Sequence, residues 1–227
     1  MSAKEHGAPG EWAKIKGTVV SLWPLFVCFA LMGAFAASLV LGRHIPVFFS
    51  LMIVFLVGAV ILWNRGLNRI KSYFLGAVGE ARVAAELRKL PDGYHVIHDF
   101  PIGYANFVDH VVMGPTGIFS VETKDWCGEV DIREGHIVRD GEIPKYRSPV
   151  LQSKSEARKV EKMLRKKGWD GSVTPVVCFA SNNFAGKSAE MEKVFVVNAN
   201  EIAGLITSMN ASISPDTVER IVKLSGN

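Results

Sequence analysis

Residues 108–124 read VDHVVMGPTGIFSVETK, and this stretch decides how the rest of the chain is organised. Two short apolar runs flank a Pro115-Thr116 turn, which is the pattern of a β-hairpin. Asp109 and Glu122 are equally far from the turn, so symmetric pairing makes them cross-strand neighbours with Cβ atoms about 5 Å apart. Lys124 follows Glu122 by two residues and shares its face of the strand. The stretch therefore predicts two carboxylates and an ammonium group at one end of a hairpin.

The length of the loop decides whether the two carboxylates meet. A four-residue loop over 114–117 keeps the symmetric pairing, whereas Pro115 cannot adopt the positive φ that two-residue hairpin turns favour. A three-residue loop with Gly117 in the left-handed conformation places Asp109 opposite Thr123 and sends the acids to different faces. The sequence alone leaves both registers open.

Two carboxylates this close repel each other, and one takes up a proton unless a cation lies between them. Mg2+ suits such a site because it takes oxygen ligands from one or two carboxylates and keeps several waters. A lysine beside the ion can orient a metal-bound water and offset charge on a phosphate. We therefore expect Asp109 and Glu122 to bind Mg2+, or Mn2+ in its place, next to Lys124, which is the outline of a site for phosphodiester hydrolysis.

Two uncharged runs, residues 19–41 and 45–63, precede the hairpin. A helix needs about 20 apolar residues to cross a bilayer, and only three residues separate the runs. We expect a transmembrane helical hairpin over 19–63. The alternative is a signal peptide cleaved near residues 34–36, but the first run exceeds an apolar signal segment of roughly 7–15 residues and a second run follows at once.

Basic residues predict the orientation of these spans. They precede the first run and follow the second, with one in between: Lys4, Lys14, Lys16, then Arg43, then Arg65, Arg69 and Lys71. We expect both termini to be cytoplasmic, at the inner (plasma) membrane. The predicted organisation is a cytoplasmic tail over 1–18, the membrane hairpin over 19–63, a basic linker over 64–72 and a soluble domain over 73–227.

The net charge of +4 reports on this topology. Residues 1–70 hold six of the 26 basic and two of the 22 acidic residues, so the soluble part is neutral. A neutral domain gives no support for nucleic-acid binding. The three cysteines are far apart and include no C-x-x-C pair, which excludes a disulfide or metal pattern.

Two expected helices carry further polar candidates. In the first, over residues 72–90, Glu80 shares an apolar face with Val83 and Leu87. A carboxylate there is costly unless it is paired or metal-bound, and a Glu at the margin of the stripe that reaches water fits the spacing equally well. The second helix begins at Ser148-Pro149 and runs to about residue 168. Gln152 lies in its first turn and can contact a metal-bound water or a phosphate.

A basic stripe follows on the same helix. Lys154, Arg158 and Lys162 are spaced by four, as residues on one helix face are. The stripe can track a phosphate backbone, although a solvated helix face is the simpler interpretation.

The remaining pattern alternates between strands and helices. We expect strands over 94–100, 130–132, 137–138, 174–180 and 194–197, and helices after Asn200 and Ser214. Together these elements predict one α/β domain with a mixed central β-sheet flanked by helices.

Several short motifs occur in a fixed order: Gly76-x-x-Gly79-Glu80, Asp109, Gly114-Pro115-Thr116-Gly117, Glu122-x-Lys124-x-Trp126-x-Gly128 and Gln152. With this set, residues 73–170 resemble the nuclease-related domain (NERD) family of the restriction-endonuclease-like superfamily. The resemblance implies that Asp109, Glu122 and Glu80 bind Mg2+ and that Lys124 positions the attacking water. Glu80 and Gln152 would complete the site from the two helices. The membrane hairpin lies outside the resemblance.

The leading hypothesis is a membrane-anchored, Mg2+-dependent nuclease that hydrolyses DNA. The alternative is a catalytically silent, membrane-tethered module of the same fold that binds nucleic acid or protein. A third hypothesis is a scaffold protein assembled through its membrane hairpin.

Overall fold

The computed structural model describes residues 2–40, 45–103, 106–145 and 148–225. The chain forms two compact units. One comprises Trp12–Leu75, and the other combines Met1–Glu11 with Gly76–Asn227.

The first unit consists of α1 (Glu11–Val40) and most of α2 (Ile45–Leu87). The two helices approach closely at two glycines, because a Cβ on Gly17 would lie 2.6 Å from the Cβ of Tyr73 and one on Gly66 would lie 2.8 Å from the carbonyl oxygen of Ser21. Small residues at such points let helix backbones come together. The predicted linker over 64–72 lies within α2.

Among the described residues, one helical stretch has the length and hydropathy of a membrane span. It is Lys14–Ala37, with a mean hydropathy of 2.1. The second predicted span is not supported, because the apolar stretch found in α2, Ile53–Leu67, is too short to qualify. The side chains of residues 45–52, which the prediction counted in that span, lie outside the described residues. Length and composition of α1 suit a membrane span and a signal sequence alike.

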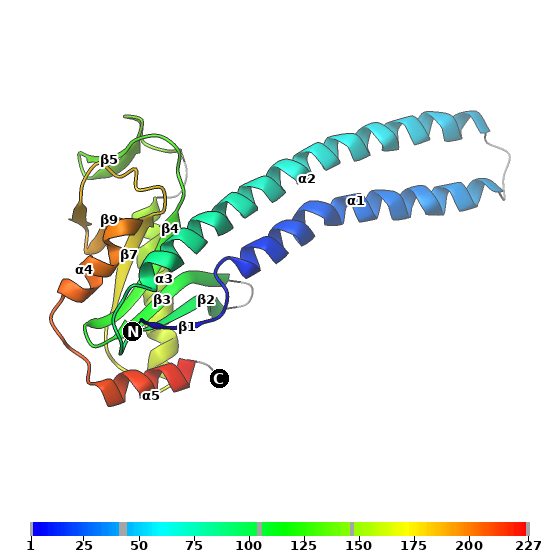
Figure 1. The fold of residues 1–227 in the computed structure, drawn as a ribbon. Coiled ribbons are helices and arrows are strands. Elements are labelled where there is room, and N and C mark those ends of the chain that lie inside the picture. The colour runs from blue at the N-terminus through cyan, green and yellow to red at the C-terminus, as the bar shows by residue number, and fades with distance from the viewer. Residues whose placement is uncertain (1, 41–44, 104–105, 146–147, 226–227) are drawn as a thin grey trace. The chain divides into compact units, whose positions relative to one another are not determined.

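The second unit is built on a seven-stranded sheet in the order β1-β2-β3-β4-β7-β9-β8 (Figure 1). Strands β4, β7 and β9 are mutually parallel, β1 is parallel to β2, and the other pairs are antiparallel. The bounds are β1 (Lys4–His6), β2 (His95–Gly103), β3 (Asn106–Gly114), β4 (Gly117–Lys124), β7 (Val173–Phe179), β8 (Ser188–Met191) and β9 (Val194–Asn198). A separate hairpin pairs β5 (Val130–Arg133) with β6 (His136–Arg139). The predicted mixed α/β sheet is confirmed.

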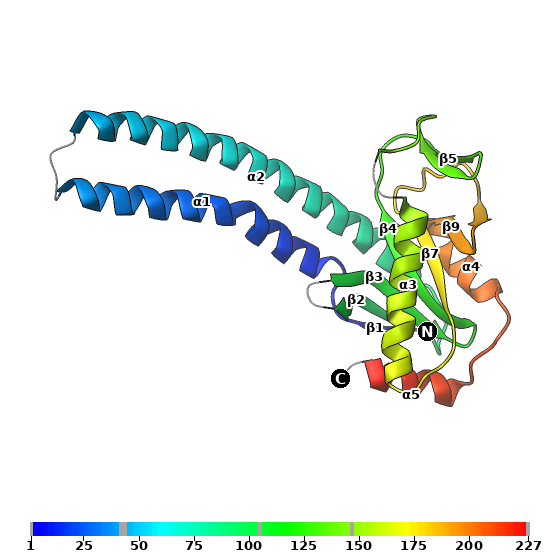
Figure 2. The ribbon, with the colours of Figure 1, turned by 180° about the vertical axis from the view of Figure 1, so that it is seen from behind.

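Helices cover both faces of this sheet. The C-terminal part of α2 and α4 (Ile202–Ser208) bury Val83, Leu87, Ile202 and Ile206 against one face. On the other face lie α3 (Pro149–Lys166) and α5 (Pro215–Ser225). Figure 1 shows α4 in front of the strands, and Figure 2 shows α3 in front of them from behind. A short 3-10 turn, η1 (Ala199–Glu201), leads into α4.

The β3–β4 hairpin adopts the symmetric register. Gly114 pairs with Gly117, and the ladder continues to His110 opposite Val121, so the next position brings Asp109 opposite Glu122. Both glycines are required: a Cβ on Gly114 would lie 2.1 Å from the ring of Tyr94, and Gly117 has a φ of +141°. The register on which the predicted site depends is therefore confirmed.

The first residues of the chain belong to the sheet, although the sequence analysis placed them in a tail over 1–18. β1 extends the edge beside β2, and the Arg88 guanidinium donates two hydrogen bonds to the Glu5 carboxylate, at 2.8 and 3.1 Å. Gly10 is buried, and a Cβ there would lie 2.7 Å from the Cβ of Ala77. The segment 2–11 is thus held on the α/β unit at several points.

Candidate active site

The C-terminal half of β4 positions the two central polar groups. Ile118 packs in the same core cluster as Ala157 and Val160 of α3. Because side chains alternate along a strand, Glu122 and Lys124 point to the same face as Ile118, toward α3. Glu122 is buried and Lys124 is partly buried at the end of the strand. The sheet therefore delivers a carboxylate and an ammonium group to the α3 side.

Lys124 joins β4 to α3. Its ammonium group forms an ion pair with the Glu122 carboxylate and donates a hydrogen bond to Oε1 of Gln152 at 3.1 Å. Gln152 reaches this position from the first turn of α3, where its backbone N–H donates to the Ser148 carbonyl at 3.0 Å. The Ser148 hydroxyl itself makes no capping bond. Three of the five predicted site residues are thus in direct contact.

Asp109 lies beside this group in β3, one residue before the first pair of the β3–β4 ladder, His110 with Val121. Its Oδ2 accepts a hydrogen bond from the backbone N–H of Thr123 at 2.7 Å. Burial, followed by the negative charges of Glu122 and Glu80, raises the pKa of Asp109 well above its ordinary value, against the opposing effects of that hydrogen bond and of Lys124. The carboxylates are close enough to repel, and a further positive charge would stabilise their ionised forms.

Glu80 is buried, with 8% of its surface exposed, as are its neighbours Val83, Ala84 and Leu87. Of the two interpretations that the spacing left open for Glu80, burial on the core-facing stripe of its helix is the one that the structure shows. Gly79 explains how the helix comes so close to the end of β4, because a Cβ there would lie 2.7 Å from the Cβ of Asp125. Glu80 thereby lies within electrostatic range of Asp109.

One residue of the site was missed by the sequence analysis. Glu156 is 8% exposed, and its Oε1 accepts a hydrogen bond from Nε2 of Gln152 at 3.0 Å. Burial, the charge of Glu122 and a hydrogen bond with Glu122 raise the pKa of Glu156 to about 8. The available signal was its spacing: Glu156 follows Gln152 by four residues and precedes the buried Ala157.

The donor set suits a hard divalent cation, but the groups are not arranged as a finished metal site. Asp109, Glu122 and Glu80 supply only carboxylate oxygens, which Mg2+ and Mn2+ prefer. Within the described residues, no group of three or more His, Cys, Asp or Glu side chains has the geometry to hold a metal ion. Lys124 is bound to Glu122 directly, so its ammonium group supplies part of the positive charge that a cation would otherwise supply.

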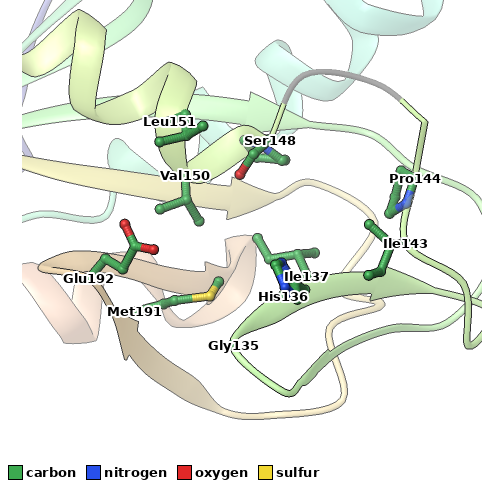
Figure 3. A pocket seen from close by; sticks show the side chains of 11 residues that line it. Gly135, His136, Ile137, Ile143, Pro144, Ser148, Val150, Leu151, Met191 and Glu192 are labelled. Carbon is green, nitrogen blue, oxygen red and sulfur yellow. The ribbon is translucent and has the colours of Figure 1, made fainter.

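The basic stripe lines a hollow on α3. Lys154 forms an ion pair with the exposed Glu192. Together with Leu151, Ser155 and Lys159, the three predicted residues Lys154, Arg158 and Lys162 line a hollow of about 440 Å³. A separate cavity of about 200 Å³ lies between the N-terminus of α3 and the β5–β6 hairpin (Figure 3). None of the residues that line this cavity is a predicted site residue.

Comparison with known proteins finds a family model that matches the segment holding the site. Residues 75–180 match the family model of the nuclease-related domain (NERD). The chain is also 33% identical over 78 residues to an uncharacterized protein of Bacillus anthracis, a match that covers 32% of this chain and 37% of that protein. No solved structure matches the chain. The family match supports the resemblance drawn from the ordered motifs, and the whole candidate site, from Glu80 to Glu156, lies within the matched segment.

Proposed function

We propose that the protein is a membrane-anchored, Mg2+-dependent nuclease that hydrolyses phosphodiester bonds in DNA at the site around Lys124. One observation carries the proposal. At the end of β4 the Lys124 ammonium group is held between the Glu122 carboxylate and the Gln152 amide, beside the crowded Asp109 carboxyl. Lysine next to paired carboxylates is suited to a reaction in which water attacks a phosphate.

The chemistry of each side chain suggests its role in the proposed reaction. Asp109 and Glu122, with Glu80 from α2, would hold Mg2+ or Mn2+ after their carboxylates turn toward a shared ion, since the described residues hold no finished metal site. Such an ion lowers the pKa of a bound water and polarises a phosphoryl oxygen. Lys124 would orient the attacking water or offset the charge that develops on the phosphate, and Gln152 would keep the Lys124 side chain at the end of the strand.

The basic stripe on α3 is the proposed contact with the DNA backbone. Lys154, Arg158 and Lys162 begin half a turn after Gln152, on the helix that also carries the site. Each phosphate that a basic residue neutralises adds about 0.9 to the salt dependence of binding. Replacing all three with Ala is therefore expected to weaken DNA binding and to flatten its dependence on salt, measured by fluorescence anisotropy at several salt concentrations.

The apolar stretch Lys14–Ala37 supports attachment to a membrane. We propose that a second span is completed by the N-terminal part of α2, that both termini are cytoplasmic and that the membrane is the inner (plasma) membrane. Cysteine accessibility to a membrane-impermeant reagent in intact cells tests this topology. Labelling of a cysteine placed near the C-terminus would contradict it.

Cleavage of plasmid DNA tests the proposed activity. The full chain in detergent micelles is expected to nick supercoiled DNA with Mg2+ and not with EDTA. Asp109→Asn keeps an oxygen that accepts the Thr123 N–H but removes the charge, and it should lower the rate about 100-fold or more, the scale of an essential catalytic group. The exposed Asp216→Asn is the matched control. Equal nicking by both variants would overturn the assignment of Asp109.

A second function is favoured by the ion pair itself. Because Lys124 already neutralises Glu122, the fold is compatible with a silent module that binds nucleic acid or a protein without cutting it. This alternative predicts DNA binding that depends on Lys154, Arg158 and Lys162 and no turnover with Mg2+ or Mn2+.

A further inference from the structure

The side-chain amide of Gln152 lies between two groups of opposite hydrogen-bonding character. A lysine ammonium group can only donate, and an amide has one accepting oxygen and one donating nitrogen. In the structure the oxygen faces Lys124 at 3.1 Å and the nitrogen faces Glu156 Oε1 at 3.0 Å. The orientation of the amide is therefore set by both neighbours together.

The helix that carries Gln152 and Glu156 is fixed on the sheet. Val150, Ser153, Ala157 and Val160 are buried along α3, and the Ser153 hydroxyl donates to the backbone carbonyl of Val176 in β7 at 3.2 Å. The two polar residues are one turn apart on this anchored helix, so Glu156 can hold the amide from a position that itself does not move.

We propose that Glu156 is a positioning residue of the candidate active site, which holds the Gln152 amide so that its carbonyl oxygen faces Lys124. Without the carboxyl group, the NH2 group of Gln152 loses its acceptor, and the amide is free to swing away from Lys124 toward water. Lys124 then keeps Glu122 as its partner but loses the acceptor on α3. The consequence for catalysis rests on the proposed nuclease function, whereas the hydrogen bond itself does not.

The hydrogen bond to the Gln152 amide needs an accepting oxygen at position 156, and Oε1 of Glu156 supplies it. Glu156→Gln keeps an accepting oxygen at this place, so it should hold the Gln152 amide as the wild type does. Glu156→Leu has a similar volume and no hydrogen-bonding group.

The sequence offers a specific probe, because Gln152 is the only glutamine in the chain. Labelling glutamine side chains with 15N in the full chain, held in detergent micelles, gives one pair of amide NMR signals. In the wild type we expect one proton of the pair to be shifted by its carboxyl partner and protected from exchange with water. Glu156→Gln adds a second glutamine and therefore a second pair of signals, but the shifted and protected pair of Gln152 should remain. Glu156→Leu should move both Gln152 signals to the positions of a solvated glutamine.

Two further variants make the outcome decisive. Glu161 lies five residues along α3 and pairs with Arg165 at the surface, so Glu161→Leu should leave the Gln152 signals unchanged. If Glu156→Leu does not fold, Glu156→Asp takes its place in the test. It retracts the carboxyl group by one methylene and should weaken the protection of the Gln152 amide. A wild-type amide with the signals of solvated glutamine overturns the proposal without any variant. An unchanged Gln152 pattern in folded Glu156→Leu overturns it as well.

The effect of Glu156 on DNA cleavage is measured separately from the NMR signals. If the wild type cleaves DNA, Glu156→Leu should lower kcat about 10–100-fold, the usual cost of losing a group that orients a site residue, with little change in KM. Glu156→Gln should restore most of the rate. Wild-type protein that does not cleave DNA would defeat the nuclease proposal, and the NMR result would still decide whether Glu156 positions Gln152.

Discussion

Replacing Glu156 with Gln should stabilise the protein at alkaline pH and leave its stability at acid pH nearly unchanged. The reason is the cost of keeping this carboxyl group in its site. Burial and the neighbouring Glu122 raise the pKa of Glu156 from 4.5 to about 8. In the folded protein the group therefore stays protonated throughout the interval in which the unfolded chain releases the proton.

The sign and size of the effect follow from linkage. Between pH 4.5 and 8 the unfolded state binds fewer protons than the folded state, so the free energy of unfolding falls as pH rises, and it levels off above pH 8. One pKa unit corresponds to 1.36 kcal/mol, which sets the total loss at about 5 kcal/mol at most for the values above. The neutral side chain of Glu156→Gln has no proton to lose and should escape this penalty.

Urea denaturation of the full chain in nonionic detergent, with EDTA and at several pH values from 5 to 8.5, measures the effect. The difference in the free energy of unfolding between variant and wild type should be small at pH 5 and grow to a few kcal/mol at pH 8. Glu161→Gln, on the exposed side of α3, is the control and should show no such growth. A difference for Glu156→Gln that stays constant with pH would refute the account of this site.

Other changes test the packing and the charges around the site. Gly79→Ala should destabilise the protein by about 1–3 kcal/mol in a thermal melt, because the new Cβ would lie 2.7 Å from the Cβ of Asp125; an unchanged melting temperature would contradict the close approach. Burial and then the charge of His98 lower the pKa of His110 to about 3, so unfolding takes up a proton below pH 6.5 and stability falls with pH toward 3. His110→Leu should remove this part of the acid sensitivity in a circular dichroism titration, and an identical acid profile would argue against it. Arg88→Ala should cost no more than about 1 kcal/mol overall yet speed amide exchange in β1, whereas unchanged exchange there would mean that the pair with Glu5 does not hold the strand.

The positions of the polar residues on the central hairpin could be predicted from the sequence, because they follow from symmetric pairing about the turn and from the alternation of side chains along a strand. A symmetric count from Pro115-Thr116 pairs Asp109 with Glu122, and the alternation of β4 then puts Lys124 on the same face. The loop length could not be derived from local rules alone. It depends on the packing beside Gly114, where the ring of Tyr94, the residue before β2, fills the space.

Other features depend on contacts that no local pattern encodes. β1 is three residues long and polar, so it carries no strand signal, and it exists because β2 offers an edge and Arg88 a partner for Glu5. Glu156 had the right spacing from Gln152, but a glutamate on a basic helix usually faces water. Its burial depends on how α3 is rotated against β4 and β7, which the tertiary packing decides.

The measurement that tests the central claim most directly is the single-turnover rate at which Lys124→Ala cleaves a labelled DNA duplex with Mg2+. Lys89→Ala is the matched control, since Lys89 is an exposed lysine of the same unit paired with Glu86. We predict that wild type and Lys89→Ala cleave at the same rate and that Lys124→Ala is slower by about 100-fold or more. Cleavage by Lys124→Ala at the wild-type rate would contradict a site built around Lys124.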